Sequence, residues 1–235
     1  MEKWFLDRPA LGLLGKEEGF GSQTGGAADL KTGADADRRE SLTGILCTTA
    51  NEAHTAVRSG FKPEEIYFVA PFEGLTKDLL GSCRFVAGGL EDLKLLESLS
   101  EGDMVKAGLR LQAPALPELE GSVRLDDLAG IAHEIKALPH LTVRGCFFCG
   151  DLRGVHGKEL GSFFRAGYEA AKRMTVTLPC AMPYLCFEGA VTALEENRTL
   201  HPETFDEALR ALDIMTMQNE TAFYARLFLS RVQQV

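Results

Sequence analysis

The chain of 235 residues carries a formal net charge of −9 at pH 7, with 45% apolar and 25% charged residues. This is the composition of an ordinary globular protein, and the acidic charge argues against nucleic acid or an anionic membrane surface as partner, because both reward clusters of Lys and Arg. The sequence has no apolar run of about 18 residues and no basic segment leading into an apolar one at its start, so we expect neither a membrane span nor a signal peptide, and a cytoplasmic location.

Residues 15–40 are rich in glycine and charge and show no periodicity. We therefore interpret residues 1–43 as a flexible N-terminal segment, although "KWFL" within it could be a strand. From residue 44 short apolar runs alternate with amphipathic patterns. Strands are predicted at 44–49, 65–70, 83–88, 103–112, 141–149 and 182–187. Helices are predicted at 51–60, 72–81, 90–100, 125–138, 157–174 and 202–217.

The final segment, residues 220–232, has the pattern of a buried helix in which a last strand could be hidden. Strands that alternate with helices imply βαβ units and a parallel sheet. A Gly-rich dinucleotide fingerprint is missing after the first strand, which favours a TIM-type (β/α)8 barrel, complete or abbreviated, over an open doubly wound sheet. We expect residues 44–235 to form one such barrel domain.

Two of the six cysteines, Cys146 and Cys149, lie three residues apart in "GCFFCG". They could be a metal clip or a redox pair. On a strand they would point to opposite faces, which argues against a shared metal, and the sequence offers no zinc spacing to a second pair of ligands. A thioredoxin-like pair should open a helix, whereas a Gly-Asp loop follows here. We therefore expect buried strand cysteines and no metal site.

The run "GILCTTANEAHTAVRSGFKPEEIYFVAP" resembles the second and third barrel strands of the pyridoxal-phosphate (PLP)-dependent decarboxylases with an alanine-racemase-like barrel. These are the ornithine, diaminopimelate and carboxynorspermidine decarboxylases. Their later segments are matched in order by "RFVAGGLEDLKLLESL", "VKAGLRLQAP", "GSVRLDDL", "VRGCFFCGDLRG" and "MPYLCFEGAVTAL". The spacing of "GLRLQAP" and "SVRL" is nearest to the carboxynorspermidine type. The resemblance implies PLP as cofactor and an amino acid or polyamine precursor as substrate.

The resemblance assigns the catalytic positions to Lys31 and Cys149. Lys31 is the lysine nearest to the place of the family's Schiff-base lysine, which binds the cofactor aldehyde. Cys149 falls where the family has the histidine that stacks on the cofactor ring, and a thiol cannot supply such a face. The family's second, β-rich domain, which completes the site of the neighbouring subunit in its dimers, has no counterpart in this sequence. A homodimer is an expectation from the family alone.

The resemblance assigns cofactor binding to Glu52, Arg110 and Gly189. Glu52 matches an acidic residue after the second strand, although a helix N-terminal carboxylate is the structural alternative. Arg110 matches an arginine of the fifth strand, where an unpaired charge is costly, so it needs a bound anion or a salt bridge, for example to Glu52. Only Gly189 remains of the triple-glycine phosphate turn, and Glu188 beside it would repel a phosphate. The family's "EPGR" segment has no counterpart.

Two functional hypotheses remain open. The first is a divergent PLP-dependent decarboxylase that acts on a basic amino acid or a polyamine precursor. The second is a non-catalytic relative, a pseudoenzyme that lost PLP binding and serves as a binding or regulatory partner of an intact decarboxylase. A further residue, His156, lies in the loop after the sixth predicted strand, where sites of barrels gather, and is either a site residue or a solvated loop histidine.

Overall fold

The computed structural model describes residues 3–7, 42–117, 119–178, 184–222 and 226–232. Its strands are β1 (Lys3–Asp7), β2 (Leu42–Thr49), β3 (Ile66–Glu73), β4 (Arg84–Ala87), β5 (Val105–Gln112), β6 (Val123–Arg124), β7 (Leu141–Cys149), β8 (Tyr184–Phe187) and β9 (Arg226–Val232). Its α-helices are α3 (Ala50–Arg58), α4 (Leu90–Ser100), α5 (Leu128–Lys136), α6 (Gly157–Thr177), α7 (Ala190–Leu200) and α8 (Pro202–Ala222), with short 3-10 turns η3 (Pro63–Glu65) and η4 (Lys77–Leu79).

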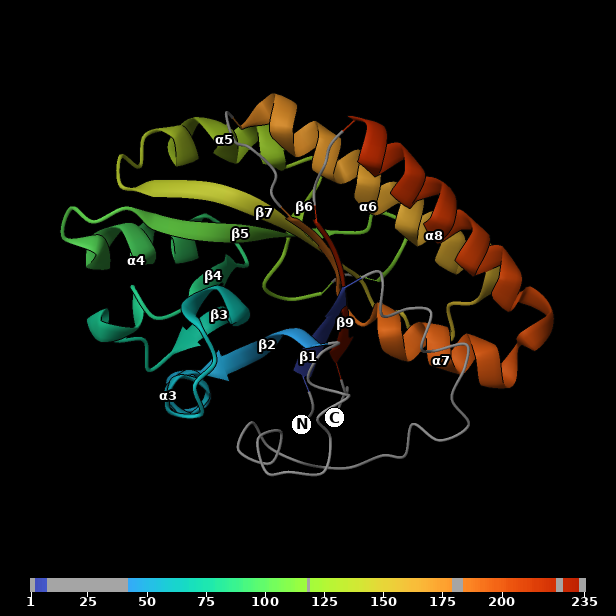
Figure 1. The fold of residues 1–235 in the computed structure, drawn as a ribbon. Helices are drawn as coiled ribbons and strands as arrows, with labels where there is room; N and C mark the ends of the chain where they lie inside the picture. The colour runs from blue at the N-terminus through green and yellow to red at the C-terminus, as the bar shows by residue number, and fades with distance from the viewer. Residues whose placement is uncertain (1–2, 8–41, 118, 179–183, 223–225, 233–235) are drawn as a thin grey trace.

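The strands form a curled, mostly parallel sheet with the helices on its outer side (Figure 1). Parallel pairing runs from β2 through β3, β4, β5, β7 and β8 to β9. Between β9 and β2 stands β1, which is antiparallel to both. The expected all-parallel (β/α)8 barrel is therefore not formed, because β1 enters the curled sheet as an antiparallel strand between β9 and β2.

Two predicted elements are wrong. The segment 72–81 is not a helix, because β3 continues to Glu73, Gly74 then takes a left-handed φ of 71°, and only the turn η4 follows. The segment 220–232 is not a buried helix, because α8 ends at Ala222 and the hidden strand, β9, fills the place beside β8. The structure also has α7, which the sequence patterns did not reveal, and β1, which contains "KWFL". Residues 8–41 lie outside the described part of the chain.

The inside of the curled sheet is filled by an aromatic floor, defined here as the rings of Tyr67, Phe147 and Tyr184. Each ring centroid lies 5.7 to 5.8 Å from the other two. Arg84, the first residue of β4, donates a hydrogen bond of 3.1 Å to the Tyr67 hydroxyl and lies over the Tyr67 and Tyr184 rings. Gly145 makes room for the floor, since a Cβ there would lie 1.9 Å from the Tyr184 ring. The floor thus joins rings from β3, β7 and β8 inside the sheet.

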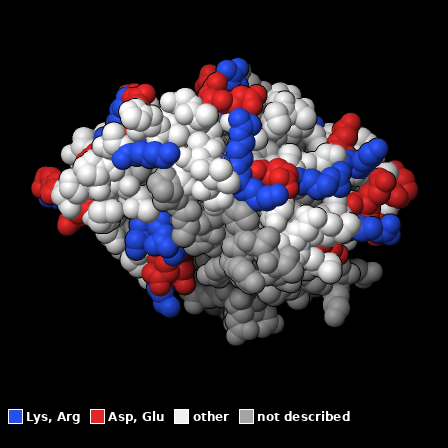
Figure 2. Space-filling model, turned by 90° about the horizontal axis from the view of Figure 1, so that it is seen from above, with Lys and Arg blue, Asp and Glu red and all other residues white. Residues whose placement is uncertain are grey.

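The outer helices carry charges of both signs. On the face shown in Figure 2 basic and acidic side chains are interspersed, and α6 contributes ion pairs such as Lys172 with Glu169 and Arg173 with Asp126. No described helix combines the length and apolarity needed to cross a membrane.

Candidate functional site

The carboxyl ends of β5, β7 and β8 bring together Arg110, Cys149 and Glu188, a group that we term the mouth. Parallel strands end at one edge of the sheet, and in barrels of this kind that edge carries the site. Arg110 pairs in register with Phe147 of β7, and Glu188 directly follows the last residue of β8. Residues far apart in the sequence therefore meet at this edge.

Arg110 and Glu188 form a bidentate ion pair. Nε of Arg110 donates to Oε1 of Glu188 over 2.9 Å, and Nη2 donates to Oε2 over 2.8 Å. Their side chains are only 15% and 11% exposed, so water screens the pair little. The charge of Glu188 raises the pKa of Arg110, which keeps the guanidinium fully ionised. Arg110 thus has the salt bridge that the sequence required, with Glu188 rather than Glu52 as its partner, because β7 pairs with both β5 and β8 and brings their ends together.

The remaining guanidinium nitrogen binds the loop that follows β5. Nη1 of Arg110 donates to the carbonyl oxygen of Gly121 over 2.9 Å and approaches that of Glu120 at 3.5 Å. All three guanidinium nitrogens of Arg110 thus have protein acceptors.

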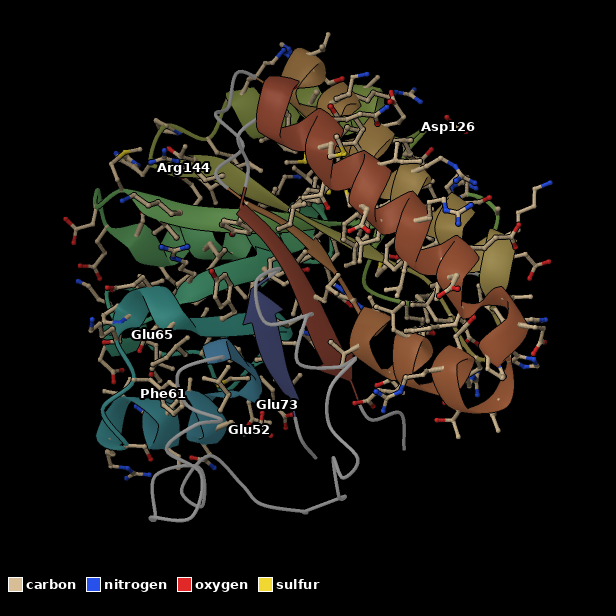
Figure 3. The ribbon with its side chains drawn as sticks, turned by 45° about the vertical axis from the view of Figure 1, so that its right-hand side comes forward. Glu52, Phe61, Glu65, Glu73, Asp126 and Arg144 are labelled. Atoms are coloured by element: carbon tan, nitrogen blue, oxygen red, sulfur yellow. The ribbon has the colours of Figure 1, made fainter. Side chains whose placement is uncertain are left out.

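Glu52 lies at the start of α3 and takes part in a capping box. Its Oε2 accepts hydrogen bonds from the backbone N–H of Thr48 at 2.7 Å and of Thr49 at 3.4 Å, while Thr49 Oγ1 accepts from the Glu52 N–H at 3.2 Å. Figure 3 shows Glu52 near Glu73, which pairs with Thr49 at the end of β3. These contacts are those of the helix N-terminal carboxylate that the sequence offered as the alternative.

Cys149 ends β7 and is fully buried. Its Sγ lies 3.5 Å from the Leu111 carbonyl oxygen. Burial, with a further contribution from the Glu188 charge, raises the pKa of Cys149 to about 12, against the opposing effect of Arg110. The thiol is therefore protonated near neutral pH and is a poor nucleophile. Cys146 packs in the hydrophobic cluster that includes the helices, and the described residues contain no group of three His, Cys, Asp or Glu side chains that could hold a metal ion.

Gly189 stands at the turn between β8 and α7 with a φ of 71°, a conformation that favours glycine. Its N–H donates to Oγ of the buried Ser230 over 3.1 Å, and the N–H of Glu188 donates to the Phe148 carbonyl oxygen over 2.9 Å. Both N–H groups have partners within the protein, and a carboxylate belongs to the same turn. This turn does not fit the phosphate group that the resemblance implies for PLP.

Two lysines bear on the site. Lys31 lies outside the described residues. Lys3 opens β1, and because β1 is antiparallel its backbone lies opposite Val232, the last residue of β9, at the same edge as the mouth. Lys3 was not expected from the sequence, because the resemblance implies a lysine at the end of a parallel first strand, whereas Lys3 begins an antiparallel one.

His156 lies at the start of α6, beyond the loop that follows β7. Its ring stacks on that of His201, with centroids 4.2 Å apart, and its Nδ1 lies 2.9 Å from the Gly154 carbonyl oxygen. The structure thus places His156 against the junction of α7 and α8.

Neither a protein-family model nor a curated protein matches the sequence. Solved structures do match. The arginine decarboxylase of Paramecium bursaria Chlorella virus aligns with a TM-score of 0.56 and 14% identity, over 79% of this chain and 50% of that one. The ornithine decarboxylase of Entamoeba histolytica gives 0.52 and 17%, over 79% and 50%. The diaminopimelate decarboxylase of Helicobacter pylori, in complex with L-lysine, gives 0.51 and 14%, over 86% and 52%.

This chain has a decarboxylase-like barrel fold. At these identities the likeness establishes the fold alone, and the chain spans about half the length of the decarboxylases it matches. The family that the sequence motifs indicated and the neighbours found by structure therefore agree at the level of the fold.

Proposed function

We propose that this protein is a decarboxylase-like barrel that does not hold PLP and acts as a binding or regulatory partner of an intact decarboxylase. The observation that carries the proposal is the bidentate pair of Arg110 and Glu188 at the mouth. A carboxylate of the protein itself satisfies the arginine that the resemblance assigns to the cofactor. An incoming phosphate would have to displace that carboxylate and leave it buried without a cation, which is costly.

Two further features support the proposal. The N–H of Gly189 already donates to Ser230, so a phosphate at this turn would have to compete for it. Cys149 stands where the resemblance places an aromatic ring, and its thiol is protonated and buried rather than poised to react. The mouth is thus satisfied by its own groups.

The second candidate is an active PLP-dependent decarboxylase of an amino acid or polyamine precursor. One observation favours it, namely the position of Lys3 at the edge of the sheet that carries the mouth. PLP, when bound, would supply the electron sink for loss of carbon dioxide. Lys3 or Lys31 would have to hold the cofactor aldehyde, and Arg110 would have to leave Glu188 to orient the ring or the substrate.

Titration of the purified protein with PLP separates the two candidates. The absorbance spectrum is recorded, the sample is reduced with borohydride, and the labelled lysine is mapped by peptide mass spectrometry. We expect no new visible band and no specifically labelled lysine. A band with the label on Lys3 or Lys31, lost in the Lys3→Ala or Lys31→Ala variant, would establish the second candidate and refute the proposal.

The proposed partnership is tested with intact ornithine-type and diaminopimelate-type decarboxylases from the organism that produces this protein. Each is mixed with the protein, and both co-elution in size-exclusion chromatography and the rate of carbon dioxide release are measured. We expect one of them to co-elute with the protein and to change its rate. If none co-elutes and no rate changes, the regulatory part of the proposal is wrong even where PLP binding is absent.

A further inference from the structure

The loop after β5 lies across the ends of neighbouring strands. We term the strap its described residues, Ala113–Pro117 and Leu119–Ser122. The N–H of Ala113 donates to the carbonyl oxygen of Cys149 over 2.8 Å, which joins the base of the strap to the end of β7. Leu116 lies so close to Gly150 that a Cβ added to that glycine would be 2.5 Å from Leu116 Cδ1. The strap therefore covers the end of β7, where Cys149 is buried.

The far end of the strap rests on β4. Its backbone approaches Gly88 so closely that a Cβ there would lie 2.4 Å from the carbonyl oxygen of Gly121. Gly88 directly follows the last residue of β4. The strap thus reaches from the end of β7 to the end of β4.

Side chains of β5 hold the strap from below through its carbonyl groups. Nη1 of Arg110 donates to the carbonyl oxygen of Gly121 over 2.9 Å. Nε2 of the buried Gln112 donates to that of Pro117 over 3.2 Å. Because Glu188 fixes the same guanidinium, Arg110 links the end of β8 to the strap. We term this three-part contact of Glu188, Arg110 and Gly121 the catch.

The strap has few apolar anchors of its own. Ala113 at its base is buried and Leu116 and Leu119 are half-buried. Most of the strap is exposed, namely Pro114, Ala115, Pro117, Glu120 and Gly121. Segments with few buried apolar contacts open at a lower free energy than the strands beneath them. The polar catch is therefore a main determinant of whether the mouth is covered.

We propose that the strap is an autoinhibitory cover of the mouth, held shut by the catch and released as a unit while the sheet stays folded. Release exposes Cys149 and the polar groups around it to solvent and to a ligand. The inference goes beyond the proposed function and holds whether or not the protein binds PLP, because it concerns access to the mouth and not what enters it.

Alkylation of Cys149 by iodoacetamide measures the opening, with each cysteine followed by peptide mass spectrometry. The catch is removed by the double substitution Arg110→Met with Glu188→Leu, which leaves neither charge without its partner. We expect the alkylation rate of Cys149 to rise about tenfold or more, because hydrogen bonds to a charged group no longer hold the strap. Buried Cys47 and Cys83 should stay unlabelled and report that the fold is intact. The matched control is Lys94→Met with Glu134→Leu, an exposed ion pair between α4 and α5, which should leave the rate unchanged.

An unchanged rate for Cys149 in the catch variant would overturn the proposal. Labelling of Cys149 together with Cys47 and Cys83 would also overturn it, because the strap would then not open as a unit.

Hydrogen exchange of the unmodified protein provides a second test that does not depend on the variant. We expect the amides of Ala113 and Leu116 to exchange faster than the paired amides of β5 and β7, and equal rates would refute an independently opening strap. Neither measurement uses PLP, so a failure here is distinct from a failure of the proposed function.

Discussion

The aromatic floor and the mouth are built on neighbouring residues of the same strands and are held together by different interactions. At the floor the Tyr184 ring packs edge to face on Tyr67 and Phe147, whose rings are tilted against each other. Glycines of neighbouring strands leave the space that the rings fill. At the mouth Arg110 and Glu188 meet as a buried ion pair. The floor therefore depends on shape, and the mouth depends on charge balance.

This difference predicts which substitutions each of the two regions tolerates. Added volume should damage the floor, since its rings have no room to move. Loss of one charged partner should damage the mouth, since it leaves the other partner buried and unpaired.

The largest expected effect is at the mouth. Arg110→Met should lower the free energy of unfolding by about 3 kcal/mol, because it leaves the Glu188 carboxylate buried without its cation. Urea denaturation measures the change. The double substitution Arg110→Met with Glu188→Leu should lie within about 1 kcal/mol of the unmodified protein, since both charges are gone. If the single and double variants are equally unstable, charge balance does not govern the mouth.

The next effect is at the floor. Gly145→Ala should lower the free energy of unfolding by about 2 kcal/mol, because its Cβ would collide with the Tyr184 ring and force the floor to shift. The control is Gly130→Ala in α5, where a Cβ meets no atom within 4 Å. That substitution should stabilise the helix by about 0.5 to 1 kcal/mol. Equal changes in the free energy of unfolding at the two glycines would show that the rings of the floor can move to accommodate the added methyl group.

Alkaline pH should weaken the fold through its buried thiols. Burial raises the pKa of Cys149 and of Cys83 from 9.0 to about 12. Between these values the folded thiols keep protons that the unfolded chain has lost, so stability is complete below pH 9.0 and falls as the pH rises towards about 12. The loss should be about 1.4 kcal/mol per pH unit for each thiol.

Denaturation of Cys149→Ala at several alkaline pH values isolates the thiol of the mouth. Its stability should fall less steeply than that of the unmodified protein, by about 1.4 kcal/mol per pH unit. Cys83→Ala should flatten the curve to a similar extent, because its thiol is also buried away from water. A slope that does not change in the Cys149 variant would mean that this thiol is hydrated, contrary to a covered mouth.

The smallest effect tests the helix cap that follows β2. Thr49→Ala should cost about 1 kcal/mol, because it removes the side-chain acceptor of the capping box that also orients Glu52. Thr199→Ala on the exposed side of α7 should change stability by less than about 0.5 kcal/mol. A cost at Thr49 no larger than at Thr199 would mean that the capping box contributes little, and Glu52 would again be a candidate for a role in the site.

Local patterns predicted most elements of the fold. The strands that became β2, β3, β4, β5, β7 and β8 and the helices that became α3, α4, α5, α6 and α8 are confirmed in type and approximate position. Each has a period of burial that follows from its own residues. The helix predicted at 72–81 is wrong because a helical spacing of apolar residues is also compatible with a strand that continues to Phe72, which packs on Phe68 and Phe85.

The candidate site was predicted less completely. Arg110 was identified as a charge in need of a partner, and Glu188 as a carboxylate that would repel phosphate, but nothing in the local sequence joins them. Cys149 was expected to be buried, and it is. The position of Lys3 depends on the direction of β1, which is set by its pairing with both β2 and β9. No local sequence pattern predicts such long-range pairing.

The sequence by itself determined the alternation of strands and helices, the acidic charge and the resemblance to the decarboxylase barrels, because these depend on residues near one another in the chain. The tertiary structure decided which charges meet. Arg110 and Glu188 are 78 residues apart, and only the register of neighbouring parallel strands brings a guanidinium and a carboxylate to one edge where burial makes their pairing obligatory.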